Sequence, residues 1–261
     1  MDEILDFAIL CAREAGEIQR RYLSRNFEVI HKGEINLLTE VDLACEERII
    51  CLIERYFPND DIVSEEKRAN LKGGQGRWIV DPLDGTTNYA HRYPFFSTSI
   101  AYEVKGEVIV GVVYSPILDE LFFAEKGKGA YMNGEKIRVS KIEKVSDSLL
   151  STGFPYDLRT SKNNNIDHFI RCLLKAQAVR RDGSAALNLA YVACGRFEGH
   201  WELKLNPWDM AAGYLLVVEA GGTVTTMAGK EFTIYEDSIL ATNGLIHREM
   251  LSVLGGGDEG V

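Results

Sequence analysis

The chain has 261 residues, of which 46% are hydrophobic and 26% are charged, so it can build an ordinary folded core. Its formal net charge of -10 argues against nucleic-acid binding through a broad basic surface, and it makes acidic clusters dependent on counter-ions. We expect a cytoplasmic protein without membrane contact and with reduced core cysteines, because no apolar run approaches about 18 residues and the five cysteines lack Cys-x-x-Cys spacing.

Two helices are predicted near the amino terminus. Apolar residues at spacings of three and four predict the first helix over residues 3–24. The second is expected between Thr39 and Phe57, where Thr39 and Asp42 match a capping box. Capping alone is enough to explain Asp42. The polar loop 32–36 before this helix contains a lysine and a glycine, and we expect it to act as a lid that orders when metal binds.

An acidic turn follows the apolar run at residues 78–80. Its sequence continues Asp81-Pro82-Leu83-Asp84-Gly85, so proline fixes φ and glycine permits a tight turn that brings Asp84 back towards Asp81. Two carboxylates forced together repel unless a cation lies between them. Oxygen ligands, including the Leu83 carbonyl, suit Mg²⁺ rather than zinc. Asp-Pro and Asp-Gly are also ordinary turn formers, so this segment alone leaves both interpretations open.

Three further segments carry candidate groups, and each has a plain structural explanation as well. Glu65 and Glu66 end a predicted strand at residues 61–64, and such pairs are common on surfaces. Asp209 is expected in the first turn of a helix that begins at Pro207, where an acid favours the helix dipole anyway. Residues 183–185 begin another helix, whose free N–H groups can hold an anion such as phosphate.

After the acidic turn, the sequence is first rich in predicted strands and then alternates between predicted strands and helices. Four β-rich runs with Lys-Gly and Asn-Gly turns predict an antiparallel meander over residues 98–104, 108–114, 120–124 and 129–139. Strands and helices then alternate, with strands at 148–152, 178–181, 197–203, 223–226 and 239–242 and helices at 165–175, 184–194, 207–219 and 245–254. This predicts a layered α/β fold. We expect one unit over 1–254, made of two packed subdomains (1–145 and 146–254), and a disordered tail at 255–261.

Four motifs in the same order resemble the signatures of the inositol monophosphatase family. They are Ser64-Glu65-Glu66, Asp81 to Asn88 (DPLDGTTN), Gly183-Ser184-Ala185-Ala186 and Pro207 to Gly213 (PWDMAAG). The resemblance covers nearly the whole chain. It implies a five-layer αβαβα sandwich, similar to sugar phosphatases, that hydrolyses phosphate monoesters with two or three Mg²⁺ ions.

The resemblance also implies roles for individual residues. The metal ligands are expected to be Glu65, Asp81, Leu83 through its carbonyl, Asp84 and Asp209. Thr86, with Asp42 and Glu65, is expected to orient the attacking water. Substrate contacts are expected from Asp84, Gly85, Thr86, Gly183, Ser184, Ala185, Glu202 and Asp209. No covalent nucleophile is required, and no histidine or cysteine is needed.

Inositol 1-phosphate is the substrate that the resemblance favours. Fructose 1,6-bisphosphate, alone or as a second substrate, is the alternative, and a nucleotide substrate is disfavoured because no extra segment is available to grip a base. Some bacterial relatives act as accessory partners of the transcription machinery, and Arg180-Arg181 resembles those members. A homodimer is expected, without direct nucleic-acid binding.

Overall fold

The structure, a computed structural model, describes residues 2–31, 37–66 and 68–255. The expected lid at 32–36 and all of the expected tail except Gly255 lie outside the described residues. Gly255 itself is the last residue of helix α7. No helix in the described part of the chain is both long and apolar enough to span a membrane.

The larger sheet has eight strands in the order β10-β9-β8-β7-β6-β5-β3-β4. β3 pairs in parallel with β5, and every neighbouring pair from β5 to β10 is antiparallel, which confirms the expected meander. The strands are β3 (Asp61–Ser64), β4 (Arg68–Asn70), β5 (Gly76–Asp84), β6 (Ser97–Val104), β7 (Glu107–Ser115), β8 (Glu120–Glu125), β9 (Gly129–Met132) and β10 (Glu135–Lys136).

The smaller sheet has five strands in the order β12-β11-β13-β15-β14. β11 pairs in parallel with β12 and β13, whereas β15 is antiparallel to β13 and β14. The strands are β11 (Leu149–Thr152), β12 (Ala178–Arg180), β13 (Gly199–Leu203), β14 (Thr223–Thr225) and β15 (Ser238–Thr242).

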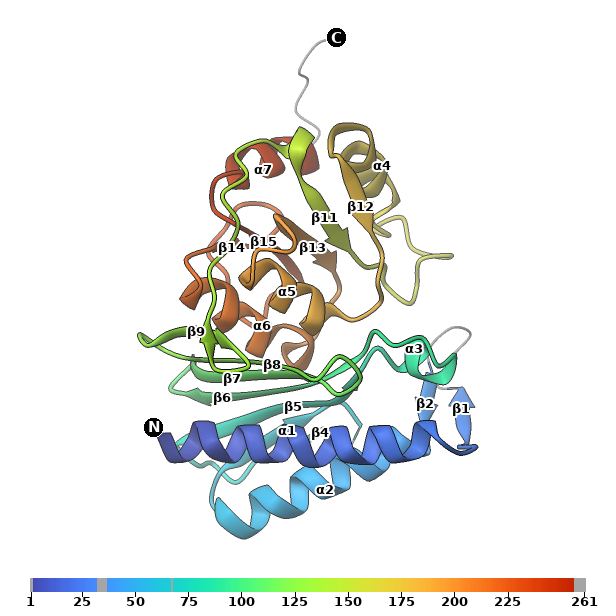
Figure 1. Ribbon diagram of the computed structural model, residues 1–261, viewed down its shortest axis with the longest axis vertical. Helices are drawn as coiled ribbons and strands as arrows, with labels where there is room; N and C mark the ends of the chain where they lie inside the picture. The colour runs from blue at the N-terminus through green and yellow to red at the C-terminus, as the bar shows by residue number, and fades with distance from the viewer. Residues whose placement is uncertain (1, 32–36, 67, 256–261) are drawn as a thin grey trace.

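Helices form three layers around the two sheets (Figure 1). α1 (Asp2–Leu23) and α2 (Glu40–Tyr56) cover the outer face of the larger sheet, and α4 (Ile166–Lys175) and α7 (His247–Gly255) cover the outer face of the smaller one. α5 (Ala185–Ala193) and α6 (Pro207–Glu219) lie between the sheets. The expected five-layer αβαβα sandwich is therefore confirmed.

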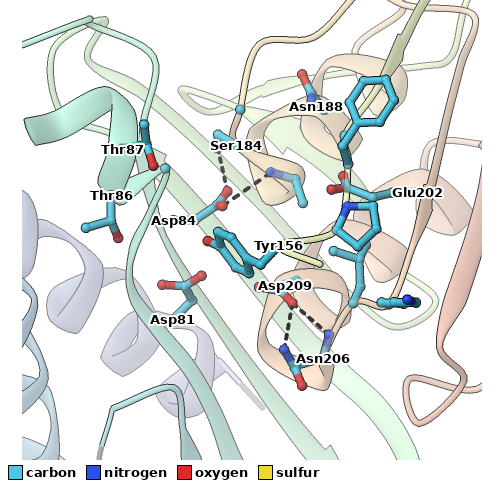
Figure 2. A pocket seen from close by; sticks show the side chains of 18 of the residues that line it. Asp81, Asp84, Thr86, Thr87, Tyr156, Ser184, Asn188, Glu202, Asn206 and Asp209 are labelled. Carbon is cyan, nitrogen blue, oxygen red and sulfur yellow. Dashed lines mark hydrogen bonds between the residues drawn. The ribbon is translucent and has the colours of Figure 1, made fainter. Parts of the chain in front are cut away.

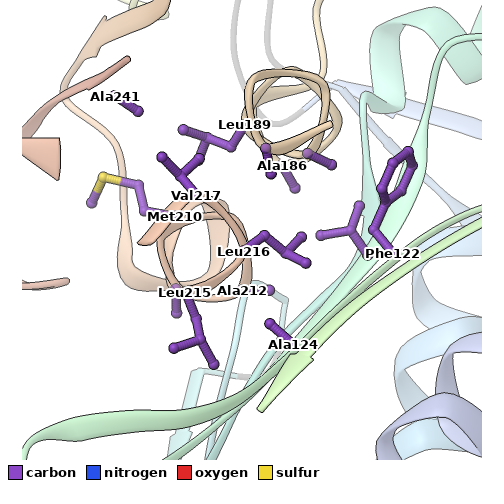
Figure 3. Packing of buried hydrophobic residues seen from close by; sticks show 14 of the residues in the cluster. Phe122, Ala124, Ala186, Leu189, Met210, Ala212, Leu215, Leu216, Val217 and Ala241 are labelled. Atoms are coloured by element: carbon purple, nitrogen blue, oxygen red, sulfur yellow. The ribbon is translucent and has the colours of Figure 1, made fainter. Parts of the chain in front are cut away.

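The middle layer joins the two sheets through small and branched apolar side chains (Figure 3). Leu216 and Ala212 of α6 lie beside Ala124 of β8, and Leu189 of α5 lies on the side of Ala241 of β15. α5 and α6 are apolar on nearly all sides because each contacts a sheet on both of its faces.

Four short elements were not expected from the sequence. They are β2 (Leu37–Thr39), which pairs with β1 (Val29–His31), then β4, the helix α3 (Thr86–Ala90), and a 3-10 turn at Val145–Asp147. Each is at most five residues long, too short to carry a clear hydrophobic period.

The cysteine expectation is correct for four positions and wrong for one. No cysteine in the described ranges forms a disulfide; Cys11, Cys45 and Cys172 are buried and Cys194 is partly buried. Cys51 is exposed, because it lies on the face of α2 that points away from the sheet.

Candidate active site

The acidic turn is shaped by an irregularity at the end of β5. The pairing of β5 with β6 shifts between Asp81 and Asp84, where Pro82 has no N–H to give to the ladder. Gly85 follows with φ +95, a conformation that residues with a Cβ rarely adopt, and Thr86 begins α3. The shift and the turn together direct Asp81, Asp84 and Thr86 into one cavity of about 140 Å³.

Thr86 joins this turn to the start of α2. Its hydroxyl donates to Asp42 Oδ1 at 2.8 Å and lies 3.1 Å from the Leu83 carbonyl oxygen. Asp42 Oδ2 accepts from the backbone N–H of Thr39 at 2.8 Å and from the Thr39 hydroxyl. Asp42 therefore caps α2, as the sequence pattern predicts, and contacts Thr86 with its other oxygen. Burial raises the pKa of Asp42 to about 6.

Asp84 lies at the amino-terminal end of α5. Its carboxylate accepts from the Ser184 hydroxyl, from the Ala186 N–H at 2.9 Å and from the Ala185 N–H at 3.3 Å (Figure 2). The free N–H groups of this helix thus hold an anion, as expected, but here the anion is a side chain of the same protein. Burial raises the pKa of Asp84 to about 6, although the Ser184 contact opposes that effect.

Asp209 and Glu65 bring two more carboxylates to the same cavity. Asp209 Oδ2 accepts from the Asn206 backbone N–H at 2.7 Å and so caps α6. Burial raises the pKa of Asp81 well above its ordinary value, and the charges of Glu65, Asp84 and Asp209 raise it further. Burial also raises the pKa of Asp209. Four carboxylates from three separate segments therefore repel one another across one space.

Eleven of the twelve predicted site residues line this cavity: Glu65, Asp81, Leu83, Asp84, Gly85, Thr86, Gly183, Ser184, Ala185, Glu202 and Asp209. The exception is Asp42, which lies behind Thr86. Glu65 belongs to the lining, whereas Glu66 donates its backbone N–H to Glu46 Oε1 at 3.0 Å.

The donor set suits a hard divalent cation. It consists of oxygens only, and its carboxylates raise one another's pKa values, so positive charge is needed to keep them all ionised. Among the residues that the structure describes, no three His, Cys, Asp or Glu side chains already form a metal-binding group. Asp84 accepts from N–H groups of α5, and Asp209 accepts from the Asn206 N–H with Oδ2.

Tyr156 and Asn188 are among the cavity residues that the sequence analysis missed. The Tyr156 ring lies among Asp81, Asp84 and Asp209 (Figure 2), and the residue is 61% exposed. Asn188 of α5 is buried, and its Oδ1 has no hydrogen-bond partner among the residues that the structure describes. No local pattern marks either residue, because Tyr156 is on an irregular loop and Asn188 is one polar residue in an apolar helix.

The model of the inositol monophosphatase family matches residues 1–255. The chain belongs to the inositol monophosphatase family. A solved inositol monophosphatase from Anabaena (Nostoc) sp. PCC 7120 is 42% identical, with a TM-score of 0.90 over 98% of this chain and 96% of that one. A fructose-1,6-bisphosphatase/inositol-1-monophosphatase from Thermotoga maritima is 40% identical over 96% of this chain and 95% of its own length. The Nus factor SuhB of Salmonella typhimurium is 39% identical over 97% of this chain and 96% of its own length.

Membership of the inositol monophosphatase family makes the chain a metal-dependent phosphomonoester hydrolase. The cavity agrees with that chemistry in its charge. Among the described residues, its lining holds five carboxylates and two cationic side chains, Arg181 and Lys204, and Lys204 already pairs with Asp157 at 2.5 Å. A phosphate monoester adds up to about two negative charges near neutral pH. Binding of a phosphate ester therefore depends on added positive charge.

Proposed function

We propose that the chain hydrolyses inositol 1-phosphate to inositol and phosphate by attack of a water molecule, with no covalent intermediate on the protein. The observation that carries the proposal is the convergence of Glu65, Asp81, Asp84 and Asp209 with the Leu83 carbonyl on one cavity. These groups would hold two or three Mg²⁺ ions. When bound, Mg²⁺ offsets the charge of the phosphate and lowers the pKa of water.

Thr86 is suited to orient the attacking water. Because its hydroxyl donates its proton to Asp42, its oxygen keeps lone pairs that can accept a hydrogen bond from water in the cavity. Asp42 is itself fixed by Thr39, so the direction of the Thr86 hydroxyl is set before a substrate arrives. Glu65 completes this group in our proposal, because its carboxylate accepts a second hydrogen bond from the attacking water.

The amino-terminal end of α5 and the end of β13 face the other side of the cavity. Gly183, Ser184 and Ala185 are proposed to contact the alcohol portion of the substrate, together with Glu202. Arg181 lies at the same edge and is exposed, so it can attract the phosphate during entry.

Phosphate release is the direct test. We would measure it from inositol 1-phosphate, fructose 1,6-bisphosphate and 3′-phosphoadenosine 5′-phosphate, with Mg²⁺ or with EDTA. Asp84→Asn should lose most of the Mg²⁺-dependent turnover and remain folded. Asp167→Asn, which changes an exposed aspartate on α4, is the matched control and should keep full activity. Wild-type turnover in Asp84→Asn would refute the site assignment.

The phosphate ester with the highest kcat/KM identifies the preferred substrate. Fructose 1,6-bisphosphate is the second candidate, because the Thermotoga maritima relative carries both activities in its name. A higher kcat/KM for the bisphosphate than for inositol 1-phosphate would replace our first choice.

A binding role in transcription is the candidate from another class. The similarity to Nus factor SuhB favours it, and Arg180 and Arg181 are both exposed. Co-purification of RNA polymerase with an affinity-tagged chain, together with no turnover of any of the three phosphates, would favour this role over catalysis.

We also propose a homodimer. Helix α4 exposes Ile166, Ile170, Leu173 and Leu174, and Leu174 is 81% exposed. The two faces of the meander are covered by α1 and α6, so α4 is the better candidate for a contact between copies. Light scattering on the wild type and on Leu174→Asp measures this, and a wild-type monomer would contradict it.

A further inference from the structure

A buried histidine lies behind the cavity carboxylate of Glu202. His200 and Glu202 are two residues apart in β13, so their side chains leave the same face of the smaller sheet. His200 is fully buried, and its Nε2 lies 3.3 Å from Glu202 Oε2. Its Nδ1 lies 3.0 Å from the hydroxyl of Ser151, the residue that faces it across the ladder between β11 and β13.

These two contacts determine which ring nitrogen carries the proton of a neutral imidazole. An ionised carboxylate only accepts hydrogen bonds, so the nitrogen beside Glu202 is the N–H. Nδ1 is then an acceptor, and the Ser151 hydroxyl donates to it. Nε2 makes no well-aligned hydrogen bond within the described ranges, which leaves the Glu202 carboxylate as the group that its N–H faces.

The position of Glu202 is limited from another direction by Gly153. A Cβ atom at Gly153 would lie 1.9 Å from Glu202 Oε1, so the carboxylate rests directly against this backbone. Gly153 and Glu202 both line the cavity. Glu202 is thus confined between a glycine that leaves room for it and an imidazole that faces one of its oxygens.

We propose that His200 and Ser151 are positioning residues, which hold the Glu202 carboxylate as a fixed hydrogen-bond acceptor for the hydroxyl groups of a polyol or sugar phosphate. This inference rests on the proposed function and identifies residues that determine its substrate specificity. The imidazole N–H faces Glu202 Oε2 at 3.3 Å, and the Glu202 carboxylate lines the cavity, where a substrate hydroxyl can donate to it. An alcohol without that hydroxyl leaves the acceptor unpaired, so the site selects against it.

The test compares two phosphate esters that differ in hydroxyl groups. We would measure kcat and KM for inositol 1-phosphate and for p-nitrophenyl phosphate, whose aromatic ring carries no hydroxyl. In His200→Leu the ratio of their kcat/KM values should fall about tenfold, the order expected for a hydrogen bond to a charged group, and mainly through KM for inositol 1-phosphate. His200→Gln should recover most of this loss, because its amide N–H can take the place of Nε2–H.

His247 offers a matched control. It is also buried, its nitrogens lie 3.0 Å from the hydroxyls of Thr225 and Thr242 on the same sheet, and it does not line the cavity. His247→Leu loses contacts of the same kind and should leave the substrate ratio unchanged. Thermal unfolding of both variants separates a loss of stability from a loss of specificity.

The outcomes separate this inference from the proposed function. An active wild type with an unchanged ratio in folded His200→Leu, or an equal fall in His247→Leu, overturns the role of His200 alone. If His200→Leu does not fold, Gly153→Ala displaces Glu202 with His200 in place, and an unchanged ratio there also overturns the inference. A wild type that hydrolyses neither ester refutes the proposed function, and this inference with it.

Discussion

Asp42 should make the stability of the protein depend on pH in a defined direction. Its carboxyl is fully buried, and burial raises its pKa from 3.8 to about 6 in the folded state. The folded state therefore binds the proton more tightly than the unfolded state does. The corresponding stability is fully present below about pH 4 and is lost as the pH rises through about 6.

The size of the effect follows from the two pKa values. The interval between 3.8 and about 6 corresponds to about 3 kcal/mol, since each pH unit is worth about 1.4 kcal/mol. Asp42→Asn removes the titration but keeps an oxygen that can accept the Thr39 N–H. We compare the free energy of unfolding of this variant with that of the wild type. The difference should grow in favour of the variant by about 3 kcal/mol between pH 4 and pH 8.

Urea unfolding in EDTA at several pH values measures this gain. The other buried carboxylates titrate in both proteins, so most of their contribution cancels in the difference. Asp167→Asn, an exposed change, should differ little from the wild type in its free energy of unfolding. The reasoning would be refuted if the difference in free energy of unfolding between Asp42→Asn and the wild type did not change with pH. It would also be refuted if the variant became relatively more stable towards low pH.

Three other changes test the site and the core. Thr86→Ala should lower kcat on the order of 100-fold with little change in KM, because the water is misplaced mainly in the transition state; steady-state kinetics with an unchanged kcat would remove Thr86 from the mechanism. Asn188→Leu should raise the free energy of urea unfolding by about 1 kcal/mol, because it removes a buried acceptor that has no partner in the described part of the chain; a loss of stability would contradict that view of Oδ1. Leu216→Ala should cost about 3 kcal/mol in the same assay, since Leu216 is fully buried between the sheets, whereas Val218→Ala, at a 40% exposed position of the same helix, is the control and should cost little. Equal losses in these two helix variants would contradict the packing of the middle layer.

Much of the fold was predictable from the sequence because its signals are local. The period of α1, the Thr39 capping pattern of α2 and the Asn-Gly turn before β10 each depend on neighbouring residues. α3 was missed because it has five residues and begins at a turn glycine.

The candidate site was predictable in its residue types but not in its contacts. Asp84 was placed in an acidic turn, yet its hydrogen bonds are made with α5, which comes about a hundred residues later in the chain. His200 carries no local signal, because its role depends on the register between β11 and β13. Contacts between distant strands and helices are decided by packing, which a sequence pattern does not contain.

The contact between Asp84 and Ala186 spans 102 residues, and this has a consequence for the order in which the protein matures. During synthesis β5 leaves the ribosome well before α5 exists, so the Asp84 carboxylate stays in water until then. Only when α5 packs between the sheets does Asp84 gain its N–H partners and lose its solvent. Phosphate release by a newly made chain therefore requires that α5 has already packed against the acidic turn.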